Sequence, residues 1–370
     1  KIYQNFTKEI LKTFLVILFG LTAIAWTVRA VNFLDLIVES GYSVPIYFKY
    51  SFLNLFGILT KFIPLSFLIS LIIFILKQIQ ENEFIILWTS GVKKLKVVNL
   101  FFITSIFILF FYILFSTIVA PMALNKSRSI LNNEGFNSFL PTIRIKQFSD
   151  SFKGFTFIVE EKFNNEIKNV FIHDRSNILK NLTSDSSSST TIIAKNGIVE
   201  EKKMILFNGQ IITSNKKTLK DNIIKFEQLN IDLKNLNTGT IKQPKLQETP
   251  TYDLIKCMLG YNDEGILNCA ESAKEEITTV LNRRMILPFY IPIISLVCSF
   301  LLIKNKSKKS FFLNKYSIFI LSFFILLYAE LIIRFTGISP TTSILFITTP
   351  FFIIPIIYSL LIFKLNRENS

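Results

Sequence analysis

The sequence predicts an α-helical membrane protein with six transmembrane helices and an all-β domain inserted between the third and the fourth. Half of the 370 residues are hydrophobic, and 39 phenylalanines are more than a water-exposed globule could bury. Six apolar runs are of the length, about 20 residues, that a helix needs to cross the hydrocarbon. Residues 121–279 contain no such run and read as strands and turns.

The apolar runs fix the order of the predicted segments. They cover residues 11–34, 48–76, 97–120, 282–303, 316–335 and 342–363. Three domains follow from this order. Residues 1–120 hold the first three helices, 121–279 the β-domain and a helical return to the membrane, and 280–370 the last three helices.

Basic residues in the short loops predict the orientation. Lysines and arginines gather before the first run and after the second, fourth and sixth, for example at Lys8, Lys77, Lys306 and Arg367. With six spans, all of them fall on one side, and cytoplasmic loops carry the excess of such residues. Both termini are therefore expected to be cytoplasmic and the β-domain to lie outside. The net charge of +15 reflects this clustering rather than a nucleic-acid stripe.

The β-domain is predicted from β-branched and aromatic runs. These runs cover residues 155–163, 166–174, 190–201, 203–214 and 222–233. Asn196-Gly197 and Asn208-Gly209 are turn dipeptides, and short strands at regular spacing indicate an antiparallel sandwich or a jelly roll.

The sequence contains no motif that indicates catalytic chemistry. The sequence lacks a GxxxxGK[ST] phosphate loop, so the chain is expected to bind no nucleotide or other cofactor of its own. Its one histidine, His173, falls in a predicted strand without convergent ligands, which favours a packing role over a metal site. Cys257 and Cys269 would both face an oxidising compartment, and the sequence leaves open whether they form a disulfide.

Charged residues near the outer ends of the spans are the first candidate site. They are Arg29, Lys49, Arg283, Arg284, Glu330 and Arg334. One interpretation is that the cations snorkel to the interface while Glu330 and Arg334 pair at i,i+4 spacing. The other is that they form a basic ring that engages phosphates of an amphiphile in the outer leaflet.

The second candidate is the loop after the second span, residues 77–97. Acids precede an apolar face and a glycine stop follows it, which predicts a short helix built from Glu81, Glu83, Phe84, Leu87, Trp88 and Gly91. Such a helix can lie on lipid. Alternatively, Phe84, Leu87 and Trp88 share a face that fits a groove in a soluble partner.

Five segments resemble the lipopolysaccharide export permease family LptF/LptG (YjgP/YjgQ) along essentially the whole chain. They are NFLDLIVESGYS (32–43), FIPLSFLISLIIFILKQIQENEFIILWTSGV (62–92), APMALNKSR (120–128), FSDSFKGFTFIVEEK (148–162) and LNRRMILPFYIP (281–292). Residues 35–43 are more similar to the F member than to the G member. Family members often carry an acidic residue just before the arginine pair, where this chain has Val280.

The resemblance implies a subunit of an ABC transporter in the bacterial inner membrane, with its β-domain periplasmic. Its partners would be an LptG-like paralogue, a dimer of an LptB-like cytosolic ATPase that uses ATP and Mg²⁺, and LptC-like and LptA-like bridge proteins. The helix around Glu83 would couple ATP hydrolysis to transport. Lipopolysaccharide would enter from the outer leaflet and leave along a β-jelly-roll track towards the outer membrane.

A second function class fits the residues without the resemblance. A membrane-anchored sensor or scaffold would bind a ligand with its outer domain and a signalling partner with residues 77–97. A membrane enzyme is disfavoured because the spans lack clustered His, Asp or Glu apart from Glu330.

Overall fold

The computed structural model describes residues 2–38, 42–134, 143, 145–152, 154–175, 188–200, 203–215, 221–232, 245–260, 271–303 and 315–369. Two compact units can be distinguished by their internal contacts. The helical unit consists of Lys1–Val28, Leu53–Asn125 and Gln243–Ser370. The second unit consists of Arg29–Phe52 and Lys126–Lys242 and holds the β-sheet.

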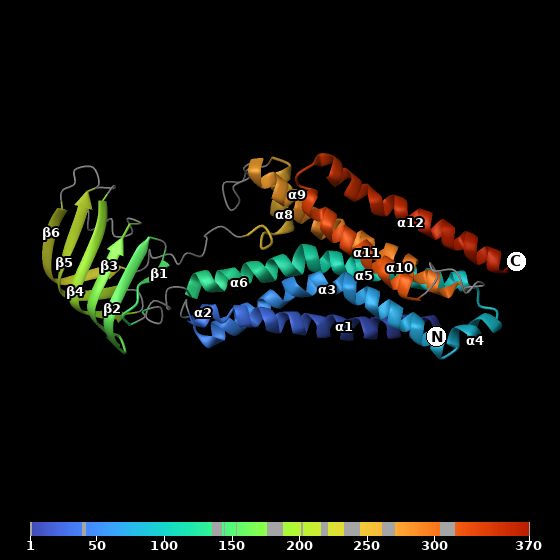
Figure 1. Ribbon diagram of the computed structural model, residues 1–370, viewed down its shortest axis with the longest axis horizontal. Helices are drawn as coiled ribbons and strands as arrows, with labels where there is room; N and C mark the ends of the chain where they lie inside the picture. The colour runs from blue at the N-terminus through green and yellow to red at the C-terminus, as the bar shows by residue number, and fades with distance from the viewer. Residues whose placement is uncertain are drawn as a thin grey trace. The chain divides into compact units, whose positions relative to one another are not determined.

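Six helical segments of the described chain are long and apolar enough to cross a membrane, as predicted. The first span, Ile2–Ile37, contains α1 (Ile2–Asn32) and α2 (Asp35–Val38), and the second, Val44–Gln80, is α3 (Val44–Gln80) (Figure 1). The third, Lys94–Leu131, contains α5 (Lys94–Leu114) and α6 (Ala120–Glu134), and the fourth, Ala273–Leu302, contains α9 (Glu271–Met285) and α10 (Tyr290–Ser299). The fifth, Tyr316–Phe335, contains α11 (Lys315–Ile332), and the sixth, Pro340–Arg367, lies in α12 (Pro340–Asn369). Two further short helices are α4 (Glu83–Thr89) and α8 (Thr251–Met258).

Prolines account for two interruptions of these segments. The third span contains a π-helical turn, Phe115–Val119, just before Pro121. The fourth span is broken by a 3₁₀ turn, Leu287–Phe289, that contains Pro288. Proline removes a backbone N–H and its ring crowds the preceding turn, which accounts for these two interruptions. Proline does not interrupt every helix, because α3 continues through Pro64 and α12 through Pro350 and Pro355.

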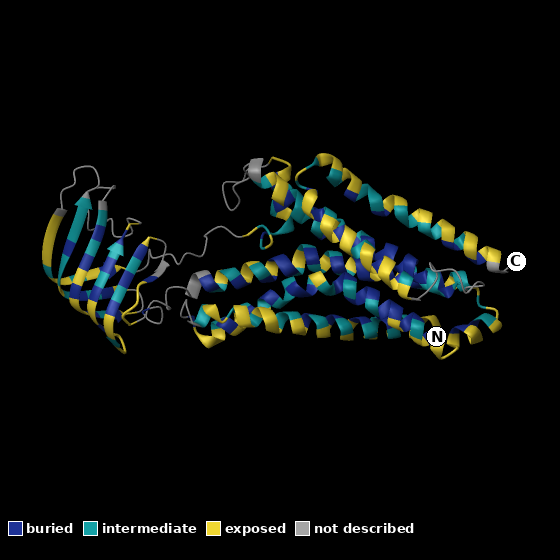
Figure 2. Ribbon diagram, viewed as in Figure 1, coloured by how far each residue is buried: buried dark blue, intermediate teal, exposed yellow. Residues whose placement is uncertain are grey.

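The core of the helical unit lies between α3, α5 and α10. Phe67, Phe74, Phe101, Ile294 and Leu296 are all fully or almost fully buried there. In contrast, only 17% of the apolar stretch of the first span, 22% of the fifth and 17% of the sixth are buried within the chain. Figure 2 shows the exposed residues along α1 and α12. These helices therefore present apolar surface to lipid or to another protein.

The β-domain contains one six-stranded antiparallel sheet in which each strand pairs with the next along the chain. The strands are β1 (Ser149–Phe152), β2 (Phe155–Phe163), β3 (Glu166–Asp174), β4 (Ser188–Glu200), β5 (Lys203–Asn215) and β6 (Asp221–Asp232). The five predicted strands are confirmed, and β1 was not predicted. Consecutive pairing makes the described sheet a meander, whereas a jelly roll contains Greek-key crossovers.

One row of residues creases the sheet. Asn169 in β3 and Asn208 in β5 have positive φ values of 49° and 51°. The strand registers place Lys195 of β4 opposite both of them. Every second residue of a regular strand faces inward, but this alternation shifts by one residue at the row, so that Ile167 and Val170, three positions apart, are both buried. A left-handed residue within a strand bends it as a bulge does, so the long strands curve around their core.

The crease corrects one prediction. Asn196-Gly197 and Asn208-Gly209 were expected to be turns, but they lie inside β4 and β5. A Cβ atom on Gly209 would lie 2.3 Å from the carbonyl oxygen of Ile193 and 2.5 Å from the ring of Phe226. The dipeptide is needed here for the left-handed asparagine and for the close approach of neighbouring strands.

Candidate functional site

The predicted short helix after the second span is α4, and its glycine stop is confirmed. Gly91 has φ 84°, and its N–H donates to the carbonyl of Trp88. The N–H of Val92 donates to the carbonyl of Leu87, which completes a Schellman motif. Glu83 is the first residue of the helix, while Glu81 lies in the turn that precedes it.

The apolar face of α4 is used inside the chain. Phe84 and Leu87 are only 3% and 7% exposed and belong to the core of the helical unit. Phe84 packs edge-on against Phe6 of α1 and stacks on Trp88, with centroid distances of 6.2 and 5.6 Å. Phe84, Leu87 and Trp88 do share one face, as expected, but that face packs against the core of the helical unit.

The face of α4 that remains accessible was not singled out from the sequence. Ile86 is 65% exposed, and Glu83 and Ser90 are exposed as well. Spacings of three and four residues place these three side chains on one side of the helix. The pattern of apolar residues could not separate the two sides, because isoleucines follow Phe84 at positions 85 and 86.

The helix before α4 is tied to α1. Lys77 forms an ion pair with Glu9, and the side-chain amide of Gln78 donates to the same carboxylate at 3.4 Å. Together with the Phe6 contacts, this ion pair holds the C-terminal end of α3, which precedes α4, against α1. A sequence pattern gives no signal for Glu9, because its partners lie 68 and 69 residues away.

At the other end of the spans, Arg283 pairs with Glu330. Nη2 of Arg283 in α9 lies 2.7 Å from Oε1 of Glu330 in α11. One of the two interpretations of the sequence paired Glu330 with Arg334. Arg334 lies instead in a 3₁₀ turn, Ile333–Phe335, that follows α11, so it does not sit above Glu330 as it would in an α-helix. Arg334 is exposed.

Arg284 has a different environment from its neighbour. It is 6% exposed, and its Nη1 and Nη2 atoms donate to four protein oxygens. The acceptors are the carbonyls of Leu246, Gln247 and Thr249 and the hydroxyl of Thr251, at 2.9 to 3.2 Å. Successive residues of a helix point about 100° apart, so Arg283 can face α11 while Arg284 faces the segment that contains Leu246 to Thr251.

Arg29 and Lys49 belong to the second unit. Both are exposed, and neither forms an ion pair with a residue that the structure describes. The hydroxyl of Tyr47 donates to the carbonyl of Ala30 at 2.9 Å, which joins α1 to α3 beside both cations. Two exposed cations that form no ion pair with a described residue are available to an anionic ligand.

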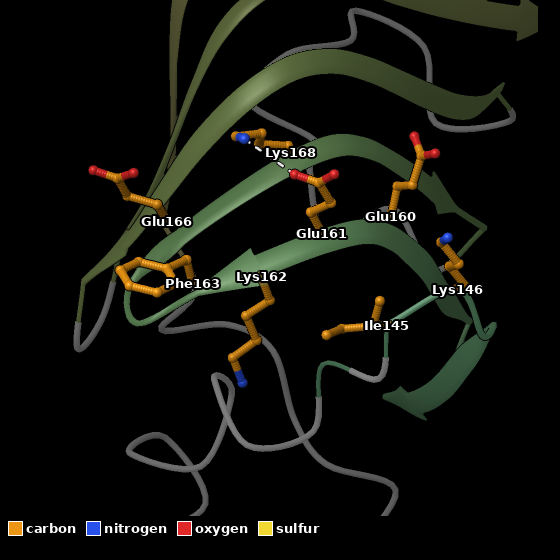
Figure 3. Close-up of a pocket in the computed structure, with 8 residues that line it drawn as sticks. All are labelled: Ile145, Lys146, Glu160, Glu161, Lys162, Phe163, Glu166 and Lys168. Carbon is orange, nitrogen blue, oxygen red and sulfur yellow. Dashed lines mark hydrogen bonds and ion pairs between the residues drawn. The ribbon is translucent and has the colours of Figure 1, made fainter.

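The β-sheet carries a groove of about 450 Å³ at the β2–β3 hairpin (Figure 3). It is lined by Ile145, Lys146, Glu160, Glu161, Lys162, Phe163, Glu166 and Lys168. Lys168 and Glu161 form an exposed ion pair at 3.0 Å, and Lys162 points away from this pair. Three lysines and three glutamates balance, so the groove has no net charge to select an anion.

Other residues singled out from the sequence have structural surroundings. His173 lies within hydrogen-bonding distance of Thr191 and accepts a bond from Arg175, which agrees with a packing role. Cys298 is a free, buried thiol, Cys257 is disulfide-bonded, and Cys269 lies outside the described residues. Within the described part of the chain, no cluster of three potential ligands could hold a metal ion.

The sequence model of the family described as lipopolysaccharide export system permease LptF/LptG matches residues 5–364. It covers both members and does not distinguish F from G. The chain is also 28% identical over 178 residues to the uncharacterized protein RP871 of Rickettsia prowazekii (strain Madrid E). That alignment covers 47% of this chain and 48% of the relative, so the chain spans about half the length of the relative that it matches.

Proposed function

Because the chain belongs to the LptF/LptG family of lipopolysaccharide export permeases, we propose that it is a permease subunit that extracts lipopolysaccharide from the outer leaflet of the bacterial inner membrane. The family match over residues 5–364 carries this proposal, since it includes the helices and the β-domain alike. In it, the chain forms a heterodimer with an LptG-like paralogue and passes lipopolysaccharide to LptC-like and LptA-like bridge proteins.

The energy would come from a separate ABC ATPase dimer that uses ATP and Mg²⁺. The sequence of this chain has no phosphate-binding loop of its own. Moving several acyl chains out of a bilayer costs about 0.8 kcal/mol per CH₂ group, which thermal energy cannot supply. An apolar surface that replaces lipid contacts lowers this cost, and the exposed faces of the first and fifth spans are suited to it.

Contact with the ATPase is assigned to the accessible side of α4. The termini and α4 would be cytoplasmic and the β-domain periplasmic, by the distribution of basic residues. Glu83, Ile86 and Ser90 would then touch the ATPase, while Phe84 and Leu87 hold α4 to the helical core. A force on the exposed side is thereby transmitted to α1 and α3.

The exposed cations are assigned to the lipid phosphates. Arg29, Lys49 and Arg334 are exposed, and Arg283 is partly exposed with its charge shared with Glu330. A guanidinium or ammonium near the membrane surface binds phosphate through charge-assisted hydrogen bonds. Arg284 is left out of this set, because its Nη donors are already bound to protein oxygens.

Copurification and reconstitution test the function. The tagged chain, extracted from its native membrane in mild detergent, should carry an ABC ATPase, a paralogous permease and lipopolysaccharide. In proteoliposomes, the complex should release lipopolysaccharide to an added periplasmic acceptor only when ATP is present. Release without a nucleotide hydrolase would refute the proposal. Recovery of a signalling protein instead of an ATPase would favour the sensor or scaffold.

A further inference from the structure

The third span contains a backbone carbonyl whose α-helical hydrogen-bond donor is missing. In an α-helix, the carbonyl of Thr117 would accept the N–H of residue 121, but that residue is Pro121 and has no N–H. The π-helical turn Phe115–Val119 lies at this place. An unsatisfied carbonyl in a membrane-spanning helix is costly, because no water is available to replace the missing donor.

Thr251 supplies the missing donor from a distant part of the chain. Its hydroxyl donates to the carbonyl oxygen of Thr117 at 2.7 Å, across 134 positions of sequence. Thr251 is the first residue of α8, and Pro250 precedes it. It lies where the chain returns from the β-sheet to the helical unit.

Arg284 continues the chain of hydrogen bonds. Its Nη1 donates to the hydroxyl oxygen of Thr251 at 2.9 Å, so that this hydroxyl accepts one bond and donates another. The hydroxyl of Ser116 donates to the carbonyl of Arg284 at 2.8 Å, which is a second hydrogen bond between the third span and α9. The remaining Nη bonds of Arg284 hold the turn at Leu246–Thr249.

We propose that Thr251 is a positioning residue that relays a hydrogen bond from Arg284 to the Thr117 carbonyl and thereby locks the returning segment 246–251 to the break in the third span. A hydroxyl is required at position 251, since only a group that both accepts and donates fits between a guanidinium and a carbonyl. Lysine cannot replace Arg284, because one ammonium group cannot reach four acceptors in this geometry.

Hydrogen exchange on the purified full-length chain tests the relay without reference to transport. Thr251→Val should speed exchange about tenfold, equivalent to about 1.4 kcal/mol, in peptides covering 113–123 and 246–258. Thr251→Ser should behave as the wild type. Thr104→Val is the matched control, because among the described residues the Thr104 hydroxyl bonds to the carbonyl of Leu100 within its own helix. It should change neither peptide.

A second variant keeps the test specific to the Thr117 carbonyl. Pro121→Ala supplies an N–H at position 121, so adding it to Thr251→Val should restore protection of 113–123 but not of 246–258. The relay is wrong if Thr251→Val affects only its own peptide, or if the alanine fails to restore the third span.

The consequence for transport rests on the proposed function. In the reconstituted complex, Thr251→Val should lower the ratio of lipopolysaccharide-stimulated to basal ATP hydrolysis about threefold, while Thr251→Ser keeps it, because a loosened segment couples substrate to the helices poorly. An unchanged ratio would overturn the positioning role. If no ATPase copurifies with the wild-type chain, the proposed function fails and the exchange experiment still decides whether the relay exists.

Discussion

Arg283 and Glu330 form an ion pair that joins α9 to α11, with 2.7 Å between Nη2 and Oε1. The two residues are 47 positions apart and begin and end neighbouring spans. The family resemblance left Arg283 without an acidic partner nearby in sequence, and Glu330 provides one from another helix. The pair thus compensates a charge that would be costly to leave alone beside the hydrocarbon.

Reversing the pair tests this compensation. Arg283→Glu and Glu330→Arg should each lower lipopolysaccharide release about fivefold or more, equivalent to about 1 kcal/mol, and also lower the thermal midpoint in detergent, because each places like charges side by side. The double reversal should recover most of both losses. Lys274→Gln removes an exposed charge from the same helix and serves as control. Additive losses in the double variant would show that the pair does not couple the helices.

The two sides of α4 should respond differently to truncation. Phe84→Ala removes a buried ring and should lower the stability of the chain by roughly 3 kcal/mol. Ile86→Ala removes a side chain of similar character that is 65% exposed, so it should leave the thermal midpoint within about 1 °C but weaken ATPase copurification at least about threefold. Normal ATPase recovery with Ile86→Ala and Ile86→Asp would remove this face from the proposed interface.

Local patterns were sufficient to predict the spans and most strands. A run of apolar or β-branched residues predicts its own secondary structure without reference to the rest of the chain. The predicted bounds of two strands, 155–163 and 166–174, are those of β2 and β3. β1 was not predicted, because its sequence, Ser149–Phe152, has no apolar pattern and forms a strand by pairing with β2.

Relations between distant segments could not be predicted. The acceptors of Arg284 lie 33 to 38 residues earlier, and no spacing rule connects them. Phe84 packs against Phe6 of α1, and Phe6 packs in turn against Phe74 of α3. Asn208-Gly209 is a dipeptide typical of hairpin turns, and only the register of β4, β5 and β6 shows that it lies within β5 at the crease.

The β-domain should become more stable as the pH rises towards 10.5. Burial lowers the pKa of Lys162 below its ordinary value of 10.5. Between the lowered pKa and 10.5 the unfolded chain binds more protons than the folded one, so stability from this residue is present above that window and is lost as the pH falls through it. Lys162→Met should flatten this rise in a series of unfolding curves at alkaline pH. Lys203→Met, at an exposed lysine of β5, should leave the slope unchanged.

The crease of the sheet should depend on backbone conformation rather than on side-chain contacts. Asn208 has φ 51°, a value that costs alanine roughly 1 kcal/mol and glycine nothing, so Asn208→Ala should destabilise the sheet and Asn208→Gly should not. Gly209→Ala should be more harmful, because its Cβ would meet the Ile193 carbonyl at 2.3 Å. Gly20→Ala is the control, since nothing lies within 4 Å of a Cβ there and alanine favours the helix. Hydrogen exchange of β4 and β5 in the full-length chain measures each effect, and equal protection in Asn208→Ala and Asn208→Gly would show that the left-handed residue does not set the bend.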